Sequence, residues 1–442
     1  VVGDAGIDVA PVLAAARGEG RVEDARAVLA AAGFASPDTV IGAVGRWLGG
    51  AYPATRTPRA RGMVTALLPD LLGEISRLAD VHTDAAFAAF DLFVSQLPAG
   101  VQLFSLLRNN PDLLRLLALL MGVAPRIARI LPRRPRLLDV LIDPAFFGKA
   151  VSAAAIAQAL EEELSEVDTY EGILDRLRVF GQEQRFLVAV RVLTGSLAAR
   201  DIGEAFADIA EVLVAAALAA ARREFARRHG TVPGGEVALL ALGKLGGREM
   251  TATSDLDLIL VYDHDPAVTA SDGERPLPPS QYFVRLTQRL VAALSAATAE
   301  GTLYEVDFRL RPSGNAGPLA TSLASFERYQ KESAWTWEHM ALTRARVLAG
   351  DPGLSERLRT VIRDALVRPR DPERLRADIA DMRARIQREK GARDHFHLKT
   401  VPGGLVDVEF LAQYAQLASA HARPDALATS TADQIARAAE TG

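Results

Sequence analysis

Two aspartates one residue apart, Asp255 and Asp257, are the residues of this chain best placed to do chemistry. They stand at the start of an apolar run, Leu256–Tyr262, which predicts a buried strand. Because side chains alternate between the faces of a strand, both carboxylates are expected to point the same way. Neighbouring carboxylates repel each other unless a cation lies between them, and Mg²⁺ prefers such hard oxygen ligands. The pair therefore predicts a magnesium site.

A glycine-rich turn precedes this pair and follows another apolar run, Val237–Leu242, which predicts a second buried strand. Glycines allow backbone N–H groups to approach a triphosphate closely. We therefore predict that the phosphates of a nucleotide bind at this turn, with two side chains as additional donors. The predicted nucleotide-binding residues of this region are Gly243, Lys244, Gly246, Gly247 and Ser254.

A third acid is expected from a later segment, Leu303–Leu310, in which apolar and charged residues alternate as in a strand. Asp307, Arg309 and Arg311 occupy alternate positions, so one face would offer a carboxylate and two guanidiniums. Acids that hold metal ions and arginines that neutralise phosphate charge suit nucleotidyl transfer. We predict Asp255, Asp257 and Asp307 as catalytic metal ligands for two Mg²⁺ ions. The alternative is an edge strand with solvated charges.

A glycine turn, an Asp-x-Asp strand and a later third acid form the pattern of the polymerase-beta-like nucleotidyltransferases. The longer motifs resemble those of the glutamine synthetase adenylyltransferase family, over residues 90 to 420. They read GKLGGREM, SDLDLILVY, LYEVDFRLRPSGNAGPLATS and AWTWEHMALTRARVLAGD. The resemblance implies an α+β fold, mostly helical, in which a small mixed sheet with helices is flanked by all-α domains.

Enzymes of that family have two related halves, one that attaches AMP and one that removes it by phosphorolysis. The segments Arg309–Gly314 (RLRPSG) and Ala334–His339 (AWTWEH) resemble the attaching half. The resemblance thus implies transfer of AMP from ATP to a tyrosine hydroxyl of glutamine synthetase, releasing pyrophosphate. It also implies glutamine and the PII signalling protein as effectors. Two alternatives stay open: the adenylyl-removing half, and a non-catalytic regulatory module that binds a nitrogen-signalling protein.

Composition restricts the classes of protein to which the chain can belong. A net charge of −4 over 442 residues gives no basis for nonspecific nucleic-acid binding. The absence of cysteine excludes disulfides and thiolate metal sites and favours a cytoplasmic location. No uninterrupted apolar run approaches the length of about 18 residues that a membrane span needs. The first residue is Val1 rather than methionine, so we expect a fragment of a longer protein.

Three regions are expected along the chain: a helical region over residues 1–134, a nucleotidyltransferase domain over 135–350, and a helical region over 353–442 that is expected to be truncated. The sheet of the middle region is predicted within residues 235–320. A polar loop, residues 263–279, and an amphipathic helix, residues 281–297, are expected to interrupt it.

Other candidate site residues have weaker support. Asp407 and Glu409 follow a second glycine turn, but a helix would place them on different faces. His339 could contact substrate, although a structural role is favoured. Asp394-His395-Phe396-His397 has the appearance of a metal cluster, but without further His or Cys at ligand spacing we do not expect zinc there.

Overall fold

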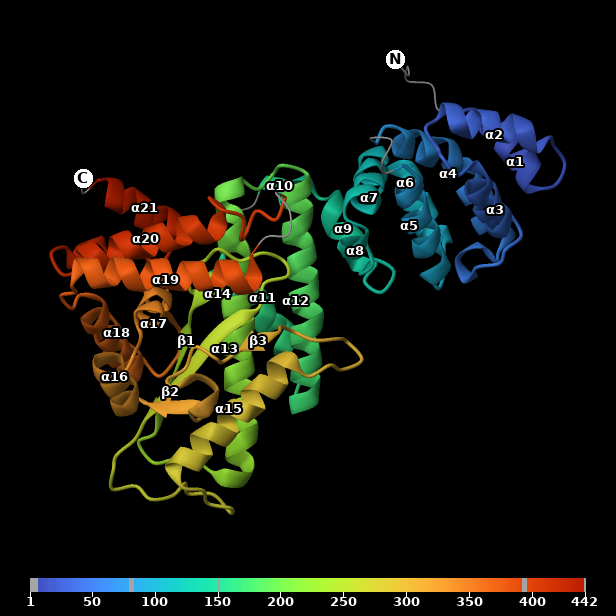
Figure 1. The fold of residues 1–442 in the computed structure, drawn as a ribbon. Coiled ribbons are helices and arrows are strands. Elements are labelled where there is room, and N and C mark those ends of the chain that lie inside the picture. The colour runs from blue at the N-terminus through green and yellow to red at the C-terminus, as the bar shows by residue number, and fades with distance from the viewer. Residues whose placement is uncertain (1–6, 79–82, 149–151, 392–395, 441–442) are drawn as a thin grey trace. The chain divides into compact units, whose positions relative to one another are not determined.

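The structure is a computed structural model that describes residues 7–78, 83–148, 152–391 and 396–440. The chain forms two compact units (Figure 1). One comprises Val1–Ala150 with Ala189–Ser196, and the other Val151–Val188 with Leu197–Gly442. None of the helices in the described ranges is both long and apolar enough to cross a membrane.

The described part of the first unit is helical, as the sequence predicts. Prolines begin several of its helices, where the missing N–H has no intrahelical partner to lose. In its core, Trp47 stacks on Phe87 at 5.6 Å between ring centroids, and its indole N–H donates to Asp91 at 2.8 Å. The helices are α1 (Ala10–Ala16), α2 (Val22–Ala31), α3 (Pro37–Leu48), α4 (Pro58–Ser76), α5 (Thr83–Gln96), α6 (Val101–Asn109), α7 (Pro111–Val123), α8 (Pro125–Ala128), α9 (Arg136–Ile142) and α10 (Pro144–Gly148).

The second unit combines helices with one sheet. Long helices α11 to α13 precede the sheet, α15 to α17 lie between its strands in the chain, and α18 to α21 follow it. Their bounds are α11 (Ala153–Leu164), α12 (Tyr170–Leu193, whose last residues belong to the first unit), α13 (Ile202–His229), α14 (Gly243–Gly246), α15 (Pro279–Ser295), α16 (Leu323–Glu332), α17 (Thr336–Leu342), α18 (Pro352–Leu366), α19 (Pro372–Lys390), α20 (Leu405–Ser419) and α21 (Thr431–Ala439).

The sheet is small and mixed. Its strands are β1 (Glu236–Ala241), β2 (Leu256–Asp263), β3 (Val306–Asp307), β4 (Ala320–Ser322) and β5 (Arg346–Gly350), in the order β3-β2-β1-β5. β1 is antiparallel to β2 and β5, whereas β2 is parallel to β3 and β4. β3 and β4 follow each other along the same edge of β2. The predicted fold class, mostly helical with a small mixed sheet, is confirmed.

Helices cover both faces of this sheet. Ile259 and Val261 of β2 belong to a buried cluster with residues of α16, α17, α18, α19 and α20. On the other face, α13 and α15 contact the strands and each other. Because Asp257 alternates in phase with Ile259 and Val261, its carboxylate points toward the side that carries the C-terminal helices.

The prediction of a strand over Leu303–Leu310 is wrong beyond two residues. Only Val306–Asp307 pairs as a strand, because the Asp307 carboxylate accepts the Arg309 N–H at 2.7 Å and turns the chain. The predicted alternation of Asp307, Arg309 and Arg311 on one face therefore fails. The strands β4 and β5 were not predicted. Ser322, at the end of β4, caps α16, and its hydroxyl accepts from the Ser325 N–H.

Candidate functional site

The parallel pairing of β2 with β3 brings the predicted aspartates to one end of the sheet. Asp257 and Asp307 are direct register partners across this pair, and Asp255 stands two residues before Asp257. Burial, together with the nearby negative charges of Asp255 and Asp307, raises the pKa of Asp257 to about 6. Negative charge is therefore concentrated at a half-buried position.

Unlike Asp257, Asp307 has its negative charge balanced by an adjacent arginine. Its carboxylate accepts from Nε of Arg309 at 2.8 Å, and this guanidinium lowers the pKa of Asp307. Within the described ranges, no three His, Asp or Glu side chains are close enough together to hold a metal ion. In this arrangement the three predicted ligands are neighbours, and Asp307 is bound to Arg309.

The predicted glycine turn lies directly against Asp257. It forms the single helical turn α14, and the N–H of Leu242 just before it donates to the Asp257 carbonyl at 3.0 Å. Gly243 has φ +54°, and a Cβ at this position would lie 2.0 Å from Oδ2 of Asp257. Only glycine fits here, since both the backbone conformation and the adjacent carboxylate exclude a side chain.

Arg344 supports the other side of this turn, and it was not among the predicted site residues. A Cβ on Gly247 would lie 2.4 Å from Nη2 of Arg344, and one on Gly246 would lie 2.0 Å from the Arg344 carbonyl oxygen. Arg344 is 4% exposed and forms ion pairs with Glu249 and Glu409. No local pattern in the sequence around Arg344 indicated this contact, since Glu249 lies 95 positions away.

The remaining predicted donors differ in availability. Lys244 is half-buried and has no carboxylate partner in the parts of the chain that the structure describes. Ser254 is buried, and its hydroxyl accepts from the Thr251 N–H at 2.9 Å. Arg311 is also buried and donates to backbone carbonyls, including that of Pro318 at 3.1 Å. Of the two arginines predicted to meet phosphates, only Arg309 presents an exposed side chain.

The acidic pair of α20 has separate partners, as the predicted helix implies. Asp407 accepts from Arg383 and from the Gly403 N–H at 2.6 Å, and Arg383 lowers the pKa of Asp407. Glu409 faces Arg344 at 3.4 Å and so adjoins the glycine turn through that residue.

The two candidate histidine sites have structural partners. Burial and nearby arginines lower the pKa of His339 to about 4, and its Nε2 lies 3.2 Å from the Gln330 carbonyl. His339 is therefore neutral at physiological pH, in agreement with the favoured structural role. Of the candidate zinc cluster, Asp394 and His395 lie outside the described residues, and Nδ1 of His397 lies 2.7 Å from the Thr400 hydroxyl.

A pocket of about 520 Å³ opens beside the aspartates. Asp255, Asp307, Arg309, Arg311 and Asn315 contribute to its lining, so it combines carboxylates, guanidiniums and an amide. Its volume lies within the range of about 300–1,000 Å³ that small-molecule sites occupy. A polar, charged pocket of this size is compatible with a nucleotide.

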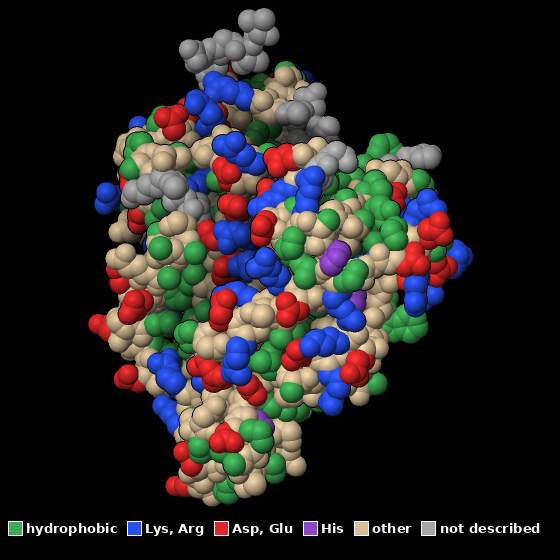
Figure 2. All heavy atoms as spheres, turned by 90° about the vertical axis from the view of Figure 1, so that its left-hand side faces the viewer, with side chains coloured by type: hydrophobic (Ala, Val, Ile, Leu, Met, Phe, Trp, Pro, Cys, Tyr) green, Lys and Arg blue, Asp and Glu red, His purple; other side chains and the backbone are tan. Residues whose placement is uncertain are grey.

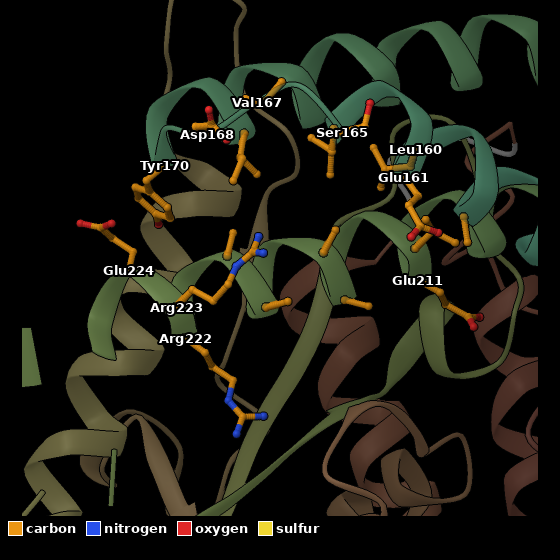
Figure 3. Close-up of a pocket in the computed structure, with 18 of the residues that line it drawn as sticks. Leu160, Glu161, Ser165, Val167, Asp168, Tyr170, Glu211, Arg222, Arg223 and Glu224 are labelled. Carbon is orange, nitrogen blue, oxygen red and sulfur yellow. The ribbon is translucent and has the colours of Figure 1, made fainter. Parts of the chain in front are cut away.

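A second pocket, of about 1120 Å³, lies between α11 and α13 (Figure 3). It shares no lining residue with the aspartate pocket, and alanine, valine and leucine side chains form most of its walls. Arginines also line it, but none of the residues predicted to hold a metal ion or a nucleotide does. Four of the predicted site residues, Asp255, Asp307, Arg309 and Arg311, line the smaller pocket instead.

Surface charge gives no single-signed area on the face toward the viewer in Figure 2. Basic and acidic side chains are interspersed there. A face of this kind lacks the basic stripe that a nucleic-acid backbone would need.

Comparison with known proteins assigns the family. A family model described as glutamate-ammonia ligase adenylyltransferase matches residues 114–361, which is more than half of the chain and contains all three aspartates and the whole sheet. The chain belongs to this family. Membership makes it a homologue of nucleotidyltransferases and implies a nucleotide substrate. Residues 380–441 are in addition similar to a model described as GlnD PII-uridylyltransferase.

Curated relatives agree with this family. The chain is 49% identical over 415 residues to a protein of Brucella suis, covering 92% of the chain and 42% of the relative. It is 46% identical over 438 residues to one of Mesorhizobium japonicum, covering 98% and 44%. Both relatives are described as bifunctional glutamine synthetase adenylyltransferase/adenylyl-removing enzymes. The chain spans less than half the length of these relatives.

Proposed function

We propose that this chain is an adenylyltransferase that moves AMP from ATP to a tyrosine hydroxyl of glutamine synthetase and releases pyrophosphate. The observation that carries the proposal is the register pairing of Asp257 with Asp307, directly beside Gly243 of the glycine turn. Carboxylates and a close backbone approach are together what transfer from a nucleoside triphosphate needs. The descriptions of the relatives support glutamine synthetase as the acceptor protein. By the same family relationship, the PII signalling protein and glutamine are proposed as effectors.

The side chains at this site suit divalent cations in kind and charge. Three carboxylates supply hard oxygen donors of the type that Mg²⁺ prefers, and the raised pKa of Asp257 reports negative charge that a cation would offset. Asp255, Asp257 and Asp307 are the residues that would hold the proposed two Mg²⁺ ions. Bound there, Mg²⁺ would offset charge on the triphosphate and favour ionisation of the attacking hydroxyl.

Each residue then has a defined part in binding and orientation. The backbone of Gly243 would approach the phosphates, with the ammonium of Lys244 as a flexible donor. The N–H groups of Gly246 and Gly247 donate to the Leu242 and Gly243 carbonyls, so these two glycines would contribute through the shape of the turn. Arg309 is exposed and able to turn from Asp307 to phosphate oxygens, which would release the carboxylate. Released from Arg309, the Asp307 carboxylate would then accept from the acceptor hydroxyl and orient it.

The two buried donors, Arg311 and Ser254, are proposed to position other residues of the site. Arg311 would keep the segment after Asp307 in place through its carbonyl contacts and contribute charge at short range. Ser254 would fix the start of β2 through Thr251 and so position Asp255.

The choice between attachment and removal of AMP is based on two sequence motifs. The segments Arg309–Gly314 and Ala334–His339 resemble the AMP-attaching half of the family, which supports transfer onto the synthetase. Phosphorolytic removal of AMP is the alternative, because the relatives are described with both activities.

Mass spectrometry of glutamine synthetase would test the proposal. We expect this chain, ATP and Mg²⁺ to add one AMP to an acceptor tyrosine of unmodified synthetase. The matched reaction contains modified synthetase and inorganic phosphate. Loss of AMP in the second reaction without addition in the first would assign the removing activity instead. No change in either reaction would leave only a regulatory role.

A further inference from the structure

Glu249 connects the glycine turn to the far end of the chain. Its own N–H donates to the Lys244 carbonyl at 2.8 Å, which ties it to the turn. Its carboxylate accepts from the N–H of Thr431 and from the Thr431 hydroxyl, the latter at 3.1 Å. The same carboxylate forms an ion pair with Arg344. One side chain therefore joins three segments that are remote in sequence.

Arg344 passes this connection to the nucleotide turn. It is almost fully buried, and its guanidinium fills the space that a side chain at Gly247 would otherwise occupy, while its backbone carbonyl lies against Gly246. Among the described residues, Nε of Arg344 has no acceptor, and Glu409 is more distant at 3.4 Å. Arg344 therefore depends on Glu249 for its position.

Thr431 is the first residue of α21, and Ser430 caps that helix. The N–H at such a position has no partner within its own helix. Here it donates to Glu249. Any displacement of the start of α21 therefore removes two hydrogen bonds from the carboxylate that holds Arg344.

We propose that Glu249 is a positioning residue through which α21 sets the conformation of the nucleotide-binding turn, so that the C-terminal helices regulate nucleotide affinity. The inference rests on the proposed function in one respect, that the ligand of the turn is a nucleoside triphosphate. Because coupling between two sites is reciprocal, nucleotide binding also stabilises the start of α21. A partner that draws α21 away from Glu249 lowers nucleotide affinity without contacting the nucleotide.

Replacement of Thr431 by proline breaks the connection selectively. Proline lacks both donors but suits the first position of a helix, and Ser430 already has the extended conformation (φ −81°, ψ 144°) that precedes proline. Thr431→Ser keeps both donors and is the matched control. Affinity of the 442-residue chain for a non-hydrolysable ATP analogue with Mg²⁺ is measured by calorimetry. Hydrogen exchange of amides 243–249 is measured without nucleotide.

We expect Thr431→Pro to weaken analogue binding about tenfold, in line with loss of hydrogen bonds to a charged group. Exchange of amides 243–249 should become faster, and Thr431→Ser should match the wild type in both measurements. Glu249→Gln, which breaks the connection from its other end, should reproduce the loss of affinity. This second variant decides the question if Thr431→Pro does not fold.

The inference is overturned if both variants only lower the melting temperature while analogue affinity and exchange of amides 243–249 stay at wild-type values. A different result separates it from the proposed function. If the wild type does not bind the analogue but Thr431→Pro still accelerates exchange at 243–249, the coupling stands and the assignment of the nucleotide is wrong.

Discussion

Asp257 on β2 and Asp307 on β3 are register partners across a parallel pair, yet their charges are balanced in different ways. Asp307 is bound by Arg309, whereas Asp257 has its pKa raised to about 6 and so takes up a proton in mild acid. The site is thus a pair of neighbouring carboxylates, of which one is bound by an arginine and the other is disfavoured in its charged form, mainly by burial and also by nearby acids. Each of these conditions has a measurable consequence.

Replacing Asp257 by asparagine should separate stability from activity. Loss of a disfavoured charge should raise the free energy of unfolding of the metal-free protein at pH 7, by about 1–3 kcal/mol. AMP transfer should fall by several orders of magnitude, because a metal ligand is lost. Urea unfolding and the mass-spectrometric transfer assay would measure the two effects. Substantial remaining transfer would remove Asp257 from the mechanism.

The pH dependence of stability should contain two opposing contributions. Between about pH 4 and 6 the folded state binds more protons at Asp257 than the unfolded state, so this contribution to stability falls as pH rises. Between about pH 4 and 6.5 the unfolded state binds more protons at His339, so that contribution rises with pH. Each amounts to roughly 3 kcal/mol at most, and they partly cancel in the wild type.

Single substitutions should reveal each contribution. Asp257→Asn should give a protein whose stability rises from pH 4 to 6.5, and His339→Gln one whose stability falls from pH 4 to 6. Urea unfolding at half-unit pH intervals without metal would show the slopes. Identical slopes in the two variants would contradict these assignments.

Gly243→Ala should lower stability and transfer by more than the cost of placing alanine at a positive φ. Gly234→Ala is the matched control, since Gly234 also has positive φ (+64°) but a Cβ there would meet nothing within 4 Å. The control should cost about 1 kcal/mol of stability and leave transfer intact. Gly243→Ala should cost more and reduce transfer about a hundredfold, because the new methyl group displaces the Asp257 carboxylate. Equal losses of transfer in the two variants would mean that contact with Asp257 is unimportant.

Arg309→Gln should free Asp307 for a metal ion. In the nucleotide-free protein, Mg²⁺ affinity should increase about fivefold, as expected when a competing exposed ion pair is removed. Calorimetric titration with Mg²⁺ would measure this. Arg359→Gln removes an equal charge from an exposed ion pair on α18 and should have no effect. Unchanged Mg²⁺ affinity in Arg309→Gln would indicate that Asp307 is not a ligand.

Local patterns were sufficient to predict the parts of the site that depend on one segment. The apolar run that starts at Leu256 and the glycine turn occur where expected, since alternation and glycine act over a few residues. The strand over Leu303–Leu310 was overestimated because the bond from the Arg309 N–H to Asp307 competes with strand pairing. The alternation of apolar and charged residues, which suggested the strand, contains no information on this competing bond.

Long-range contacts were beyond sequence reasoning. Arg344 and Glu249 are 95 positions apart, and Thr431 bonds Glu249 from 182 positions away. Nothing in the neighbouring residues of each identifies its partner. Charged residues of this kind read as solvent-exposed, although Arg344 is buried under the glycine turn. Burial of an ion pair depends on the complete chain path, which one sequence without relatives does not give.

The edge of β2 is shared by two short strands, so the chain between them can vary while the pairing of the sheet is kept. β3 holds Asp307 and β4 resumes the edge at Ala320, while the residues between them leave the sheet and are anchored by Arg311. Because Arg311 holds this stretch through backbone carbonyls, its side chains can be exchanged while those bonds are kept. Exchange of residues 312–319 between homologues should therefore change the surface beside the proposed catalytic carboxylates and leave their register intact.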